Sequence, residues 1–98
     1  MVLVRQVLGE VLRGERVRQG RTLRDVSKEA MVSLGYISEI ERGVKEASSE
    51  CLAAVCSALE LPLSSVLELV SRELRREEAA TVGTLAPVDA SVYDAAAA

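Results

Sequence analysis

Apolar residues recur at helical spacing along most of this 98-residue chain. In the first segment, for example, Val4, Leu8, Val11 and Leu12 fall on one side of a helix. Because the chain holds no Phe and no Trp, its core must be aliphatic, which suits helices packed on helices. The pattern therefore predicts an all-α fold. The predicted helices cover residues 4–19, 23–30, 34–42, the stretch from Ser48 or Ser49 to just before Pro62, and 63–78.

Residues 22–43 contain two short helices with clear start and stop signals. Thr22 offers an N-cap hydroxyl with Asp25 three residues later, and Ser33 caps a second helix that ends at Gly43. Only two residues remain for the corner between these helices. Two helices joined so tightly form a helix-turn-helix unit, which places the N-terminal side chains of its second helix in the major groove of DNA.

The fifth predicted helix carries a longer apolar stripe than a domain of this size needs. The stripe includes Val66, Leu69, Val70 and Leu74. It can cover the core, or it can form a homodimer interface. We favour the homodimer, because helix-turn-helix proteins usually read two half-sites with a two-fold pair.

The periodic pattern stops after residue 78, and alanine dominates the remaining sequence. This stretch contains no capped apolar segment, so we expect residues 79–98 to form a flexible Ala-rich tail. Residues 4–78 are then the only predicted domain.

The residue types exclude most enzyme chemistry. The chain has no His, so Ser-His and Cys-His nucleophile pairs are absent, and it has no glycine-rich phosphate loop. Cys51 and Cys56 point about 140° apart on a helix, which suits neither a disulfide nor a shared metal ion. Cys56 belongs to a core stripe, whereas Cys51 is either a buried thiol or a redox sensor. We expect no enzymatic activity, no cofactor and no metal.

The net charge of −3 hides an uneven distribution. Residues 1–45 hold nine Lys or Arg against six Asp or Glu, a net charge of +3, whereas residues 46–98 hold three against nine, a net charge of −6. The basic half contains the predicted helix-turn-helix unit. A positive face of this kind attracts the phosphates of nucleic acid.

The apolar runs are short and interrupted by charge. The sequence predicts neither a membrane span nor a signal peptide, and we expect a cytoplasmic protein without a membrane partner.

Several motifs together resemble the Cro/C1-type helix-turn-helix domain of the XRE class. The most specific is Val32-Ser-Leu-Gly-Tyr-Ile-Ser-Glu-Ile-Glu-Arg-Gly, and the likeness spans about residues 4–69. Together with Gly20-Arg-Thr-Leu-Arg-Asp-Val-Ser and Lys45-Glu-Ala-Ser-Ser-Glu, this motif also resembles the actinobacterial regulators of Clp protease genes. The resemblance implies a five-helix domain with an extended C-terminal helix.

The resemblance also implies roles for individual residues. Those matching positions that face base edges are Ser33, Leu34, Gly35 and Glu39, and those matching positions near phosphates are Thr22, Arg24, Tyr36, Arg42 and Lys45. Arg16 and Glu41 match an ion pair that ties the first helix of the domain to the third.

The sequence departs from the class pattern at four positions. Leu23 stands where the class usually has a phosphate-binding Gln, and Met31 stands where Gly is frequent. Glu15 and Arg21 replace Leu, so we expect them to thin the contacts of the first helix and leave a moderately stable core.

The resemblance predicts a sequence-specific transcriptional regulator that binds a partly palindromic DNA operator as a homodimer. It implies an activator of Clp protease and other proteostasis genes, with RNA polymerase and Clp protease as further partners. The ending in Ala97 and Ala98 is similar to tags recognised by Clp proteases and is a candidate degradation signal; the alternative is an Ala-rich remnant. Two other functions stay open. One is a repressor of the phage or antitoxin-associated type, and the other is a helical protein-binding adaptor that does not bind DNA.

Overall fold

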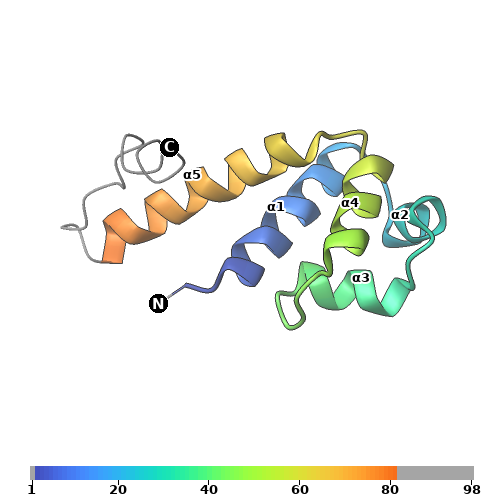
Figure 1. Cartoon of the computed structure of the whole chain (residues 1–98), viewed down its shortest axis with the longest axis horizontal. Coiled ribbons are helices and arrows are strands. Elements are labelled where there is room, and N and C mark those ends of the chain that lie inside the picture. The colour runs from blue at the N-terminus through green and yellow to red at the C-terminus, as the bar shows by residue number, and fades with distance from the viewer. Residues whose placement is uncertain (1, 82–98) are drawn as a thin grey trace, which may run out of the picture.

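The computed structural model describes residues 2–81 of the chain, and these residues form five helices (Figure 1). The helices are α1 (Val4–Arg18), α2 (Leu23–Ala30), α3 (Leu34–Glu41), α4 (Ser49–Ala58) and α5 (Leu63–Thr81). The first four gather into a bundle, and α5 lies along α1 and extends past it. The all-α prediction is confirmed, and the predicted ends of the first four helices agree closely with the observed ones.

The last helix is longer than predicted. It continues through Ala79, Ala80 and Thr81, so the prediction that a tail begins at residue 79 is wrong for these three residues. Alanine is the strongest helix former, and residues 63–82 contain no Gly or Pro that would end the helix. The candidate degradation signal at Ala97 and Ala98 lies outside the described residues.

The core is aliphatic and lies where all five helices meet. Its buried residues include Leu12, Val26, Ile37, Ile40, Val55, Leu59 and Val66. Three of the four residues of the predicted stripe in the first helix face the core: Leu12 is buried, and Leu8 and Val11 pack against the core. The exception is Val4, which is 59% exposed, and Val7 is buried as well.

Both cysteines are free and buried within the core. Cys51 joins Cys56 there because α4 is covered by α2 on one side and by α5 on another. Burial raises the pKa of both thiols, which disfavours the reactive thiolate. The redox-sensor interpretation of Cys51 therefore loses its basis.

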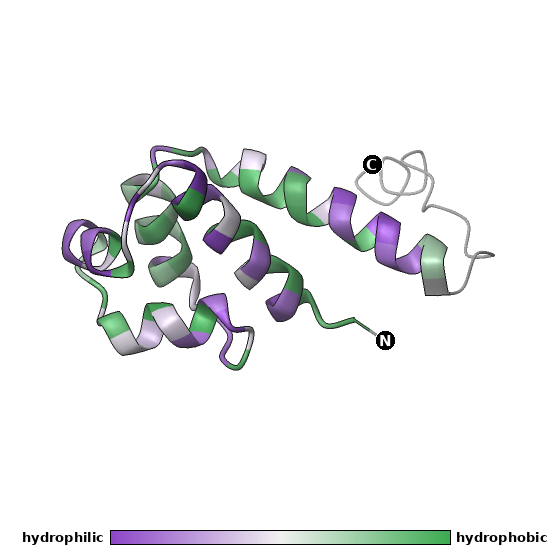
Figure 2. Ribbon diagram, turned by 180° about the vertical axis from the view of Figure 1, so that it is seen from behind, coloured by the Kyte–Doolittle hydropathy of each residue, from purple (hydrophilic) through white to green (hydrophobic). Residues whose placement is uncertain are grey.

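The burial of α5 corrects the predicted dimer interface. Val66 and Val70 are 0% and 4% exposed within a single chain, so they belong to its core and are not available as a surface seam. Leu69 and Leu74 are half-buried. Figure 2 shows why only the first half of α5 is needed for packing: that half is largely hydrophobic, and the second half is mostly hydrophilic.

The first helix crosses the end of α3 at backbone contact distance. A Cβ atom placed on Gly9 would lie 2.3 Å from the backbone oxygen of Ile40, and one on Gly43 would lie 2.8 Å from the Cα of Gln6. Arg5 adds a hydrogen bond of 3.0 Å from Nε to the oxygen of Gly43. Glycine at position 9 therefore sets how closely the two helices approach.

The loop between α1 and α2 caps the C-terminal end of α4. Gln19 donates from Nε2 to the oxygen of Leu59 at 2.9 Å, and Arg21 donates to the oxygen of Ala58 while pairing with Glu29. These bonds satisfy carbonyl groups that the helix itself leaves unpaired. Arg21 thus supplies polar contacts to α4 where we expected only a loss of packing.

Among the helices of residues 2–81, none is by itself long and apolar enough to cross a membrane. The helices α4 and α5 reach such a length and composition only as a pair, and that pair is bent by 102°.

Candidate nucleic-acid interface

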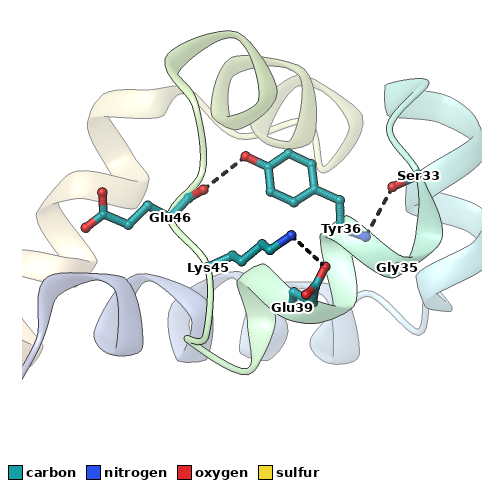
Figure 3. Close-up of a pocket in the computed structure, with 6 residues that line it drawn as sticks. All are labelled: Ser33, Gly35, Tyr36, Glu39, Lys45 and Glu46. Atoms are coloured by element: carbon teal, nitrogen blue, oxygen red, sulfur yellow. Dashed lines mark hydrogen bonds and ion pairs between the residues drawn. The ribbon is translucent and has the colours of Figure 1, made fainter.

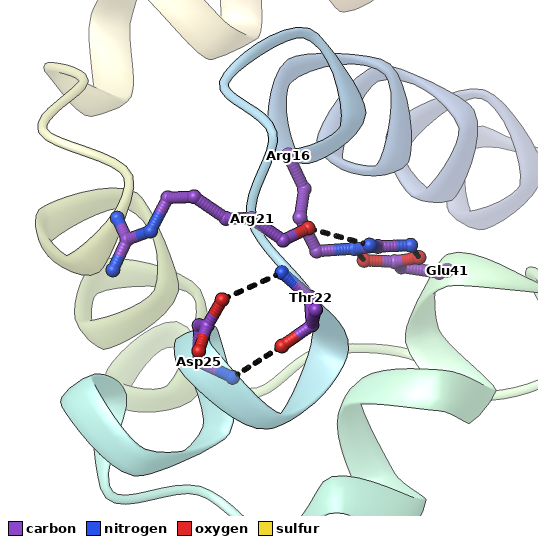
Figure 4. Close-up of polar contacts among 5 residues, drawn as sticks. All are labelled: Arg16, Arg21, Thr22, Asp25 and Glu41. Carbon is purple, nitrogen blue, oxygen red and sulfur yellow. Dashed lines mark hydrogen bonds and ion pairs between the residues drawn. The ribbon is translucent and has the colours of Figure 1, made fainter.

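The second helix begins with a complete capping box (Figure 4). The Thr22 hydroxyl oxygen accepts from the Asp25 backbone N–H at 3.0 Å, and the Asp25 carboxylate accepts from the Thr22 N–H at 2.9 Å. The hydrogen bonds from Thr22 lower the pKa of the Asp25 carboxyl. Because both groups of Thr22 are used in this way, its first role is to start α2.

The corner between α2 and α3 keeps the geometry of a tight turn although it lacks glycine. Met31 adopts a left-handed conformation with φ 58° and ψ 41° and is 91% exposed. Ser27 closes the corner: its hydroxyl donates to the backbone oxygen of Val32 at 2.5 Å, and its backbone carbonyl oxygen accepts from the Val32 N–H at 3.2 Å. Sequence reasoning missed Ser27, whose partner lies beyond the end of its helix.

The N-terminal turn of α3 stands on the surface. Ser33 caps it by accepting from the Tyr36 N–H at 3.2 Å, and Leu34, the next residue, is 39% exposed. A Cβ on Gly35 would meet nothing within 4 Å. The packing of the described residues therefore does not require a glycine there, and its bare surface leaves room for an outside molecule to approach the backbone.

The side chain of Tyr36 points to the connection between α3 and α4 (Figure 3). Its hydroxyl donates to the oxygen of Glu46 at 3.0 Å and accepts from the Ser48 N–H at 3.2 Å. A phenol has a single O–H donor, and here that donor is used within the protein. The structure thus gives the Tyr36 hydroxyl a backbone partner in place of the phosphate that we expected.

A shallow depression lies beside these residues, with Glu39 and Lys45 facing each other across it (Figure 3). The Lys45 Nζ and the Glu39 Oε1 are 3.6 Å apart, and the two side chains are 59% and 33% exposed. Figure 3 shows the residues that line it, which are Ser33, Gly35, Tyr36, Glu39, Lys45 and Glu46. A predicted base-reading carboxylate and a predicted phosphate-binding ammonium therefore pair with each other.

Two further arginines are available to bind an anion from outside. Arg24 on α2 and Arg42 at the end of α3 are both exposed, and within residues 2–81 neither guanidinium group makes a hydrogen bond or ion pair. Exposed guanidinium groups of this kind suit contacts to phosphate.

The ion pair expected between Arg16 and Glu41 is present (Figure 4). Arg16 donates from two nitrogens to the two carboxylate oxygens, at 2.7 and 2.9 Å, and its third nitrogen donates to the oxygen of Arg21 at 2.9 Å. The hydrogen bond with Glu41 raises the pKa of Arg16, so the guanidinium stays charged. The pair connects α1, the following loop and the last turn of α3, and so holds α3 in place.

Comparison with known proteins identifies the family. A helix-turn-helix family model matches residues 12–66. The transcriptional regulator ClgR of Mycobacterium tuberculosis is 59% identical over 95 residues, which cover 91% of this chain and 85% of that protein. The chain belongs to the ClgR family of helix-turn-helix regulators. It is therefore a DNA-binding transcriptional regulator.

Solved structures agree with this ClgR assignment. The clp gene regulator ClgR from Corynebacterium glutamicum has 44% sequence identity and a TM-score of 0.76, with 80% of this chain and 83% of that chain covered. The restriction-modification controller protein C.Esp1396I, solved as a tetramer with its 35 base-pair operator, shares the fold at 22% identity and a TM-score of 0.69, covering 74% of this chain and 96% of that one.

Proposed function

We propose that this regulator binds a partly palindromic operator as a homodimer and activates the transcription of Clp protease and other proteostasis genes. The observation that carries the proposal is the exposed N-terminal turn of α3, which the Arg16–Glu41 pair and the Gly9 contact hold at a defined angle to α1. The name of the C. glutamicum relative, a clp gene regulator, supports the choice of target genes.

The side chains of α3 suit only part of a direct readout of bases. Leu34 can contact a thymine methyl group, and Glu39 can accept a hydrogen bond from the amino group of cytosine. Ser33 can bond to either kind of base edge, and Gly35 permits close approach. Because Leu34 and Gly35 cannot make bidentate hydrogen bonds to a base, we expect DNA shape to supply part of the specificity.

The contacts to phosphate come from the exposed cations. Arg24, Arg42 and Lys45 provide affinity without sequence information, and Thr22 can add a weaker contact from the start of α2. These side chains come from α2, from the end of α3 and from the connection that follows it, so their phosphate contacts can hold the N-terminal turn of α3 in the major groove.

The homodimer is proposed on the exposed side of α5. There Leu67 is 50% exposed, and Leu74, seven residues later and so on the same face of the helix, is half-buried. A two-fold pair fits a partly palindromic operator, since each copy reads one half-site.

The first test is selection of bound sequences from a random double-stranded library, followed by affinity measurements at one fixed physiological salt concentration. We expect a symmetric motif bound at least ~10³-fold better than scrambled DNA. Absence of enrichment with folded protein would instead support the protein-binding adaptor.

Two variants test the division of roles. Arg42→Ala should weaken binding to all DNA sequences by a similar factor, whereas Glu39→Ala should change which sequence is preferred. If both variants act alike, the assignment of positioning and reading residues is wrong.

The sign of regulation needs transcription with purified RNA polymerase, the proposed partner of an activator. We expect the regulator to raise transcript levels from a promoter that carries the selected operator upstream. Lower levels would identify a repressor.

The proposal includes turnover of the regulator by Clp protease through Ala97 and Ala98, which rests on the sequence alone. Replacing both by Asp should lengthen the half-life of the protein in cells, and an unchanged half-life would rule out this signal.

A further inference from the structure

Lys45 belongs to the connection between α3 and α4, and it lies beside the N-terminal part of α3. Within the described residues, the side chain of Tyr36 is the only one that hydrogen-bonds to the backbone of residues 44–48 from outside that stretch. Its two bonds, to Glu46 and to Ser48, hold the connection on both sides of Ala47. At the start of the connection the Val44 N–H donates to the Glu39 backbone oxygen at 3.1 Å, so the Tyr36 oxygen is what ties the part that follows Lys45 to α3.

The position of Lys45 matters because of its neighbour Glu39. A carboxylate that enters the major groove is repelled by the phosphates, and a nearby ammonium group offsets part of that repulsion. An exposed pair 3.6 Å apart is too weak to hold two flexible side chains together by itself. The backbone must bring Lys45 to Glu39, and it is tied to α3 on both sides of Lys45: by the Val44 N–H before it and by the Tyr36 hydroxyl after it.

We infer that the Tyr36 hydroxyl is a positioning group for base readout. By tying the α3–α4 connection to α3, it keeps Lys45 beside Glu39, so that the Glu39 carboxylate can accept a hydrogen bond from a cytosine amino group. Tyr36 then determines specificity through Glu39 without contacting a base. The inference rests on the proposed DNA-binding function. It assigns Tyr36 a role other than the expected phosphate contact, and it gives Lys45 an indirect role in base readout beside its phosphate contact.

The substitution Tyr36→Phe isolates this role. The aromatic ring is partly buried against the core and is retained in Phe, so only the oxygen is lost. The bonds that it makes are exposed, so in Phe water can hydrate the freed backbone groups without tying the connection to α3. The variant should therefore fold and melt like the wild type.

The experiment compares two operators in the full chain. One is the selected operator, and the other differs only at the base pair whose preference changes in Glu39→Ala. We expect Tyr36→Phe to reduce the discrimination between the two by about tenfold, a loss comparable to one good base contact. Affinity for scrambled DNA should change far less.

A double-mutant cycle of Tyr36→Phe and Lys45→Ala tests whether Tyr36 acts through Lys45, again by the discrimination between the two operators. Lys45→Ala should lower discrimination in the wild type but have little further effect in Tyr36→Phe, because Lys45 is already misplaced there. Lys28→Ala is the matched control, since it removes an exposed cation of α2 whose ammonium group makes no hydrogen bond or ion pair within the described residues. We expect it to leave discrimination unchanged.

The outcomes separate this inference from the function on which it rests. If the wild type discriminates and Tyr36→Phe discriminates equally well, the inference is overturned. A uniform loss of affinity for every DNA sequence also overturns it, because that result indicates a phosphate contact. A wild type that does not discriminate at all contradicts the proposed function itself.

Discussion

Arg16 and Glu41, 25 residues apart in the sequence, share two hydrogen bonds of 2.7 and 2.9 Å and are only 13% and 7% exposed in their side chains. The pair joins the end of α1 to the last turn of the recognition helix. In a site so well shielded from water, each charge depends on the other, because neither can recover its hydration.

Removing one partner of this pair should destabilise the fold. We expect Glu41→Ala to lower the free energy of unfolding by about 3–5 kcal/mol, because the Arg16 charge is left without its partner. Urea unfolding measures the change. The control is Glu73→Ala, which breaks an exposed pair with Arg76 and should cost less than about 1 kcal/mol. Equal costs for the two variants would contradict the structural role of the Arg16–Glu41 pair.

The two glycines inside α1 should respond in opposite ways to alanine. At Gly9 a Cβ would lie 2.3 Å from the backbone oxygen of Ile40, so Gly9→Ala must push α1 away from α3 and should cost about 1–3 kcal/mol. At Gly14 a Cβ meets nothing within 4 Å, and Gly14→Ala should stabilise the helix by about 0.5–1 kcal/mol. Thermal unfolding of the two variants gives the comparison. A stable Gly9→Ala protein would show that the helices do not approach as described.

Replacing Met31 by glycine at the corner of the helix-turn-helix unit should make the protein more stable. A left-handed conformation costs a residue with a side chain roughly 1–2 kcal/mol, and glycine avoids this cost but loses more entropy on folding. Because Met31 is 91% exposed, little packing is lost, and Met31→Gly should stabilise the protein by up to about 1 kcal/mol. Met31→Ala keeps the strain and should show no such gain. The free energy of unfolding in urea decides between these results.

The capping box at α2 should make part of the stability depend on pH. Hydrogen bonds from Thr22 hold the pKa of Asp25 below its ordinary value of 3.8, so the carboxylate stabilises the folded state above that value. The contribution is lost as the pH falls through the lowered pKa, where the folded protein also takes up the proton.

The measurement is urea unfolding of the wild type and of Asp25→Asn at several pH values between 7 and 2. The wild type should be more stable by a constant amount near neutral pH, and the difference should shrink below about pH 4. A difference that stays constant to pH 2 would mean that the charge of Asp25 does not contribute.

Local signals in the sequence were sufficient to predict where the two helices of the corner begin, but not the Ser27 bonds that close it. Thr22 and Ser33 cap their helices as predicted, because an N-cap bonds to a backbone group only two or three residues away. The corner also tolerates Met31 in the conformation that glycine usually adopts. The Arg16–Glu41 pair is a different case, since only the family resemblance pointed to it.

The candidate interface was harder to predict. The sequence correctly suggested that the first residues of α3 are exposed, but it gave no sign that the Tyr36 hydroxyl bonds to the α3–α4 connection. Nor did the apolar stripe of α5 reveal that Val66 and Val70 are core residues. A stripe shows that one face of a helix will be buried, but not whether its own chain or a second copy covers it.

The sequence by itself thus determined the helices, their caps and the tight corner, since these depend on backbone hydrogen bonds and side-chain spacing over a few residues. Tertiary structure alone decided how closely α1 approaches α3 at Gly9, which face of α5 is covered, and which partner the Tyr36 hydroxyl finds. Those features depend on groups far apart in the chain, and only the packing of the helices brings them together.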